Sequence, residues 1–259
     1  MRRDVFSVSK TVTSLAVGLL EGDGRLSLED PVLTHLPELA DTAAAGSERI
    51  TIGHLLRMTA GNGYRWSDAD ADHPGDPARD FLATALVAEP GSSYDYAGTN
   101  TYVLGRAVHA ISGLDLRDFL VPRLFEPLGI GNPQWLRCPL GFALGAIGLQ
   151  LRTSEITRIA QLLLHDGIYD RQRLVPADYV ARMTADTTDT GRAEPDNRRY
   201  GLHVWLCARD RAWRMDGVYG QFGIVLPEQH ACVSVTAHHL GPTTEILDRV
   251  WEHIVPALV

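Results

Sequence analysis

Lysine is almost absent from this sequence: of its 24 basic residues, all but Lys10 are arginine. Cysteine is also scarce, and the three thiols, Cys138, Cys207 and Cys232, are odd in number and far apart. That spacing favours buried thiols over a disulfide framework or a metal site. No run of residues approaches the ~20 apolar positions that a membrane-spanning helix requires, so the sequence predicts a soluble protein without a membrane partner.

The composition describes an ordinary globular protein. The chain has 259 residues, of which 45% are hydrophobic and 22% charged, which is enough apolar surface for a sizeable core. A formal net charge of −8 argues against nucleic acid or an anionic membrane as the main partner. Arg2 and Arg3 are not followed by the apolar segment of a secretory signal, which predicts a cytoplasmic protein unless the natural start lies further upstream.

The single lysine lies three positions after a serine. Arginine keeps its proton throughout the usable pH range, whereas a desolvated lysine can lose its proton near pH 7 and act as a base. Ser7 and Lys10 fall on one face of a predicted helix, whose apolar positions recur at Val8, Val12, Leu15 and Leu19. The pair therefore suits nucleophilic catalysis, with the Ser7 backbone N–H available to an oxyanion. The alternative is a serine N-cap and a solvated lysine on an ordinary helix.

Helical patterns fill most of the chain and short alternating patterns fill its end. Helices are predicted from Thr51 to Gly61, across 78–88, 103–111, 116–125 and 153–167, with a last one at 243–255. Residues 62–80 form a predicted long loop, and antiparallel strands are expected at 200–207, 211–216, 221–226 and 231–237. This order predicts an α+β fold in a single domain over 1–259, with a helical lobe at about 11–199 and a sheet and helix at about 200–259.

At this point the sequence resembles the serine β-lactamase/penicillin-binding protein-like superfamily, in its class C and esterase-like branch. The segments that carry the resemblance extend over nearly the whole chain and are 6–10, 24–32, 52–61, 94–105 and 124–130. The resemblance implies a β-lactamase/transpeptidase-like fold in which Ser7 is acylated and Lys10 accepts its proton. It also implies that Tyr96 shares the proton relay. Tyr96 could instead be a packing aromatic, and Tyr94 is the competing candidate, expected to line the wall.

Two motifs depart from the family pattern. Gly98 stands where an asparagine is usual, so the amide donor to the substrate is missing there. Asn100 could substitute for it, or it could be a helix-cap or surface residue. The third motif is assigned to Met215-Asp216-Gly217, because two strands follow it, with the Val218 N–H as second oxyanion donor. His239-Leu240-Gly241 matches superficially but lies too close to the end.

The third motif bears on the substrate. Family members use a lysine or histidine there to hold a substrate carboxylate, a charge that Met215 lacks and Asp216 opposes. Arg214 could compensate, depending on where it points. The sequence therefore predicts a serine hydrolase acting on a small neutral ester or amide. The alternatives are D-alanyl carboxypeptidase or β-lactamase activity, or a catalytically impaired binding or scaffold homologue.

The third departure concerns the start of the domain, because only six residues precede Ser7. The helix and first two strands usual in the family are apparently lacking, which would leave an open sheet edge. Three explanations are open: the gene starts further upstream, a second copy covers the edge in a homo-oligomer, or the enzyme is impaired. No metal or organic cofactor is implied, since His54, His73, His165, His238 and His239 show no ligand spacing.

Overall fold

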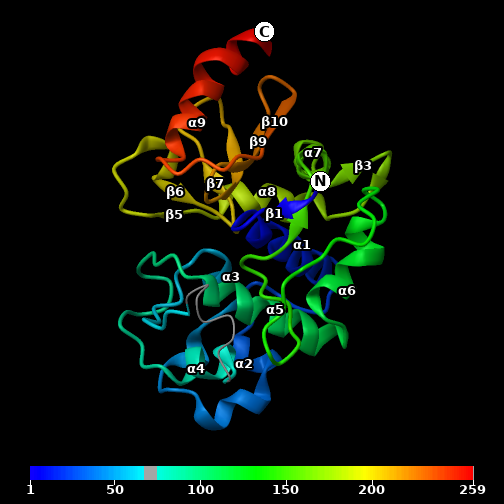
Figure 1. Cartoon of the computed structure of the whole chain (residues 1–259). Helices are drawn as coiled ribbons and strands as arrows, with labels where there is room; N and C mark the ends of the chain where they lie inside the picture. Colours follow the sequence, from blue (N-terminus) through cyan, green and yellow to red (C-terminus); the bar gives the residue numbers. More distant parts are fainter. Residues whose placement is uncertain (67–74, 259) are drawn as a thin grey trace.

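The computed structural model describes residues 1–66 and 75–258, so His73 and part of the predicted loop 62–80 lie outside the described residues. A helical lobe packs below an antiparallel sheet, and the long helix α1 (Val8–Gly22) runs between them (Figure 1). Thirteen of the fifteen residues of α1 are buried, so this helix forms the centre of the molecule. Within these residues, no helix combines the length and the apolar character that crossing a bilayer requires.

The main sheet has six antiparallel strands in the order β10-β9-β8-β7-β6-β5. Their bounds are β5 Thr188–Asp189, β6 Arg199–Tyr200, β7 Trp205–Leu206, β8 Trp213–Gly217, β9 Gln221–Leu226 and β10 Ala231–Val235. Side chains alternate along β9, so Phe222 and Ile224 face α9 (Thr244–Arg249) while Val225 joins the main core on the opposite face. Helix α7 (Thr153–Leu164) covers β9 and β10 from that opposite face.

The helical lobe is built around α5 (Gly98–Ser112), which contacts α1, α3 and α4. The remaining elements are α2 Val32–His35, η1 Pro37–Thr42, η2 Ser47–Arg49, α3 Ile52–Leu56, α4 Pro77–Ala83, α6 Leu116–Leu120, η4 Val121–Phe125, β3 Ile168–Tyr169, β4 Gln172–Arg173, α8 Ala177–Ala185, η5 Pro195–Asn197, η6 Val250–Ile254 and η7 Val255–Leu258. Thr51 caps α3 as its sequence predicts, since its hydroxyl accepts from the His54 N–H at 3.1 Å.

The segment before α1 pairs with a strand that is not part of the six-stranded sheet. Strand β1 (Arg3–Asp4) pairs antiparallel with β2 (Gln150–Leu151). Arg2 donates to both carboxylate oxygens of Glu155, whose side chain is only 3% exposed. Burial would raise the pKa of Glu155, but the Arg2 guanidinium holds it below its ordinary value. The turn that carries Ser7 is therefore anchored to α7.

Several predicted elements end earlier or break, and the helix expected from Thr51 to Gly61 ends at Leu56. The strand expected at 200–207 is two strands, β6 and β7, joined by a tight turn in which His203 has a left-handed φ of 60°. Gly201 makes that turn possible, because a Cβ there would lie 2.0 Å from the Met183 carbonyl oxygen. The helix expected at 78–88 ends at Ala83, and the last helix loosens into π and 3₁₀ turns after Arg249. Strand β9 has the predicted bounds.

One edge of the sheet is formed by β10. Among the described residues, no strand pairs with its outer side, and β1 pairs with β2 instead. The absence of the usual N-terminal helix and strands stays a prediction.

His203 is buried behind the junction of lobe and sheet. Its Nε2 lies 3.0 Å from the Thr101 hydroxyl, and its carbonyl accepts from Thr11 at 2.7 Å. Burial lowers the pKa of His203 from 6.5 to about 3. The imidazole therefore stays neutral in the folded protein at pH values where the unfolded chain binds a proton.

This difference predicts a loss of stability in mild acid. Above pH 6.5 both the folded and the unfolded chain hold a neutral His203, so the free energy of unfolding is unaffected. As the pH falls from 6.5 towards 3, only the unfolded chain binds the proton, and the folded state progressively loses stability. At pH 5 the loss should be about 2 kcal/mol relative to pH 7. His203→Asn, which tolerates the left-handed backbone, should show a smaller loss in urea unfolding at the two pH values. His253→Asn, at an exposed site, is the control, and an unchanged loss in the His203 variant would contradict the assignment.

Candidate active site

Ser7 and Lys10 face each other at the start of α1. The Lys10 amine lies 2.9 Å from the Ser7 hydroxyl oxygen and 3.2 Å from the Ala146 carbonyl oxygen, to which it donates. Lys10 is only 3% exposed, so the solvated lysine of the alternative interpretation is wrong. Ser7 does precede the helix, but its side chain makes no N-cap hydrogen bond. The pair thus has the geometry that an amine base and a hydroxyl nucleophile require.

The turn before Ser7 is strained and held from several sides. Phe6 has a left-handed φ of 48°, which is unusual for a residue with a bulky side chain. The Asp4 carboxylate accepts from the Phe6 N–H at 2.7 Å and from the Gly148 N–H at 3.2 Å. The Phe6 ring packs against Tyr219 with centroids 5.2 Å apart. These contacts hold the backbone of Ser7 in place at the N-terminus of α1.

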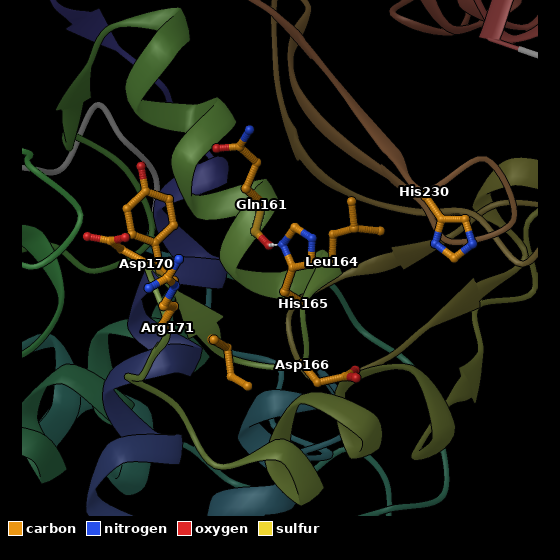
Figure 2. A pocket seen from close by; sticks show the side chains of 9 residues that line it. Gln161, Leu164, His165, Asp166, Asp170, Arg171 and His230 are labelled. Carbon is orange, nitrogen blue, oxygen red and sulfur yellow. Dashed lines mark hydrogen bonds between the residues drawn. The ribbon is translucent and has the colours of Figure 1, made fainter.

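Ser7 opens into a small cavity of about 220 Å³. Its lining comes from both lobe and sheet and consists of Ser7, Tyr96, Arg192, Asn197, Trp205, Asp216, Val218 and Thr243. A larger depression of about 730 Å³ lies at the end of α7, where Gln161, His165, Asp166, Arg171 and His230 surround it (Figure 2). None of the predicted site residues lines that depression, whereas Ser7, Tyr96 and Val218 line the smaller cavity.

Tyr96 lies beside the lysine. The Lys10 amine is 4.9 Å from the centre of the Tyr96 ring, a cation–π distance. Within residues 1–66 and 75–258, no group forms a hydrogen bond with the Tyr96 hydroxyl. Tyr94 packs behind, against Tyr200 and Trp205. Its hydroxyl is buried without a described partner, and burial raises the pKa of Tyr94 far above its ordinary value. Of the two tyrosines, only Tyr96 lines the cavity.

Asn100 lies outside the cavity lining. It is 3% exposed in the first turn of α5, and its amide donates to the Ala97 carbonyl at 3.3 Å and approaches the Met58 sulfur at 3.5 Å. The described structure therefore places Asn100 in the packing beneath the site, neither on the surface nor on the cavity wall.

The third motif runs along β8 beside Ser7. Gly217 ends the strand, and a Cβ there would lie 2.4 Å from the Val5 carbonyl oxygen and 3.3 Å from the Ser7 nitrogen. Val218 follows and lines the cavity. Only a glycine allows β8 to approach the Ser7 turn this closely, which brings the backbone of Val218 towards that of Ser7.

Asp216 does not carry a free charge into the cavity. Arg214 is 1% exposed and donates to the Asp216 carboxylate at 2.9 Å. It also donates to the Asn197 side chain and the Asp196 carbonyl at 2.6 Å each. Burial opposes the charge of Arg214, but Asp216 raises its pKa above the ordinary value. Arg214 therefore neutralises Asp216, but it does not line the cavity and does not replace the charge that Met215 lacks.

Sequence reasoning missed Arg192, Asn197, Trp205 and Thr243 as lining residues. Arg192 lies in a loop and Asn197 at the end of η5, both in a stretch without a motif. Trp205 fell inside a predicted strand, and Thr243 began a predicted helix. Only the tertiary contact between sheet and lobe brings them to Ser7. In the described part of the chain, no cluster of three or more His, Cys, Asp or Glu side chains could hold a metal ion.

A helical lobe on an antiparallel sheet, with a serine and a buried lysine one helical turn apart where they meet, defines the β-lactamase/transpeptidase-like fold. The beta-lactamase family model matches residues 2–254. The chain belongs to the beta-lactamase family, which confirms the resemblance seen in its sequence.

Individual relatives are distant. The 6-aminohexanoate-dimer hydrolase of Paenarthrobacter ureafaciens is 24% identical over 242 residues, which cover 84% of this chain and 60% of that protein. Esterase EstB of Burkholderia gladioli is 36% identical over 152 residues, covering 50% of this chain and 38% of the esterase. The octameric penicillin-binding protein homologue from Pyrococcus abyssi has a TM-score of 0.77 at 20% identity, covering 99% of this chain and 66% of that one. The chain spans between 31% and 60% of the length of curated relatives that it matches.

The close approach at Gly217 yields a test of the site's construction. Gly217→Ala must push the Val5–Ser7 turn away from β8, so we expect a stability loss of about 1–3 kcal/mol and slower labelling of Ser7 by a fluorophosphonate. The control is Gly131→Ala, because a Cβ at Gly131 meets nothing within 4 Å. A Gly217 variant as stable as the control would show that the contact is unimportant.

Proposed function

We propose that this chain is a serine hydrolase that cleaves an ester or amide through an acyl-Ser7 intermediate. The observation that carries the proposal is the 2.9 Å contact between the Ser7 hydroxyl and the buried Lys10 amine, inside a cavity. A serine hydroxyl is a weak nucleophile unless an adjacent base takes its proton. Of the 24 lysine and arginine side chains of this chain, Lys10 is the single amine, and an amine can accept a proton from a hydroxyl where a guanidinium cannot.

The reaction begins with proton transfer from Ser7 to neutral Lys10. The Ser7 oxygen forms a bond to the substrate carbonyl carbon, and the oxyanion accepts hydrogen bonds from the Ser7 and Val218 N–H groups. The proton then passes to the leaving group as its bond to the carbonyl carbon breaks. Tyr96 is proposed to share this transfer, because it lines the cavity and adjoins Lys10. Water then attacks the acyl-enzyme and releases the acid and free Ser7.

Relatives support both ester and amide chemistry. One of those compared is named an esterase and another a hydrolase of the 6-aminohexanoate dimer. D-alanyl carboxypeptidase or β-lactamase activity is the second possibility within the family, supported by the similarity to a penicillin-binding protein homologue. A panel of p-nitrophenyl esters, nitrocefin and D-alanyl peptides, assayed on wild type and Ser7→Ala, separates these activities.

One observation favours a non-catalytic homologue as the rival. The Tyr96 hydroxyl makes no hydrogen bond to Lys10, Ser7 or any other described residue. A protein that kept the fold and lost the chemistry would still bind ligands in the cavity. Fluorophosphonate labelling followed by peptide mass spectrometry decides between them, because an adduct on Ser7 supports the enzyme and folded protein without an adduct supports the rival.

Substituting the lysine gives the sharpest prediction for the enzyme. Lys10→Arg keeps a positive charge but cannot accept the Ser7 proton, so kcat/KM should fall by about 10²- to 10⁴-fold. Arg209→Lys, an exchange of the same two residue types at an exposed position, should leave the rate unchanged. Thermal unfolding of both variants checks that they are folded. A folded Lys10→Arg variant with near-normal turnover would show that Lys10 is only structural.

We further propose that β10 pairs with a second copy of the chain. The support is its unpaired outer edge among the described residues, since such edges tend to associate. The Pyrococcus abyssi homologue is itself an octamer. Sedimentation over a range of concentrations should give a mass that is a multiple of 28.4 kDa. A monomer at the highest concentration would contradict the proposal.

A further inference from the structure

Arg192 is a cation in the Ser7 cavity that the proposed mechanism does not use. It lies in the loop between β5 and η5 and lines the cavity together with Ser7 and Tyr96. Its guanidinium carbon lies 5.0 Å from the centre of the Trp205 ring. Trp205 is itself 7% exposed and packed against Tyr96 and Tyr200, so the surface under Arg192 is rigid.

The loop that carries Arg192 is braced by its own hydrogen bonds. The Arg192 N–H donates to the Thr190 hydroxyl at 3.2 Å, and that hydroxyl donates to the Asn197 carbonyl at 2.6 Å. By contrast, the guanidinium forms no hydrogen bond or ion pair with any residue in 1–66 or 75–258. Its planar set of N–H donors is therefore positioned by stacking while remaining available to a ligand.

The charge balance of the cavity favours an anion. Asp216 is the one acidic residue among the lining residues, and its carboxylate is bound by the buried Arg214. That pair is close to neutral, so Arg192 remains as an uncompensated positive charge. A guanidinium fork matches a carboxylate in shape and can bind it through two parallel hydrogen bonds.

We propose that Arg192 selects substrates that carry a carboxylate in addition to the scissile ester or amide. The inference rests on the proposed function and gives it a substrate class. It reverses the preference for neutral substrates that the third motif suggests, because the charge absent at Met215 is supplied from a different element. Trp205 and Tyr96 would contact the apolar part of such a substrate, and Arg192 its anionic group.

Two matched pairs of esters test the proposal. One pair is p-nitrophenyl hexanoate and the mono-p-nitrophenyl ester of adipate, which differ by a carboxylate on the acyl chain. The other is the methyl ester of 4-(hexanoyloxy)benzoate and its free acid, which differ by a carboxylate on the leaving group. After subtraction of spontaneous hydrolysis, we expect wild type to prefer the anionic member of at least one pair in kcat/KM. Arg192→Gln should lower that preference about tenfold.

Controls separate a binding role from a general charge effect. Arg171→Gln removes the same charge from the other depression and should leave the preference as in wild type. Arg192→Lys should retain part of the preference, because it keeps the charge without the planar fork. Raising the salt concentration should weaken the preference in wild type, since the Arg192 side chain is exposed.

A binding measurement keeps this inference distinct from the hydrolase proposal. Calorimetry on Ser7→Ala should show the anionic member of a pair binding about tenfold more tightly than its neutral partner, and Ser7→Ala/Arg192→Gln should lose that difference. This result would support the anion site even if wild type proved inactive and unlabelled. Equal binding of both members to Ser7→Ala, or a preference that survives Arg192→Gln, would overturn it.

Discussion

The contact between the Lys10 amine and the Ser7 hydroxyl is the interaction on which the rest of the structure depends. An amine in the core is costly unless polar groups surround it. Here three elements meet that need: Ser7 ahead of α1, the Ala146 carbonyl from the segment before β2, and the Tyr96 ring ahead of α5. The contacts of the buried Lys10 amine thus fix the position of α1 relative to the segment that carries Ala146 and the segment that carries Tyr96.

A second set of contacts holds the sheet against that centre. Gly217 allows β8 to reach the Ser7 turn, and the strained Phe6 backbone directs Ser7 into the cavity. The Asp216–Arg214 pair keeps the strand's acidic side chain neutralised next to the nucleophile. Strain of this kind persists only when surrounding contacts over-determine it, and the Asp4 carboxylate and the Tyr219 ring provide such contacts.

Family membership supports the proposed hydrolase chemistry, while the proposed selectivity rests on the cavity wall. The relatives are distant and longer than this chain, and the reactions in their names belong to those proteins. Tyr96, Trp205 and Arg192 form part of the cavity wall, in which aromatic side chains lie beside one cation. An aromatic surface beside a guanidinium is the basis of the proposal that the substrate has an apolar body and an acidic end.

The features that depend on local pattern were predictable from the order of residues alone. The α1 helix, the Thr51 cap, the bounds of β9 and the Ser7–Lys10 pair follow from short-range spacing, and the run of motifs predicted the fold class. Tertiary structure decided the rest. It split the strand at Gly201, because the Met183 carbonyl leaves no room for a side chain there, and it moved Asn100 beneath the site. It also brought Arg192 to Ser7 across 185 positions of chain, a proximity that arises from the packing of sheet on lobe and leaves no trace in local spacing.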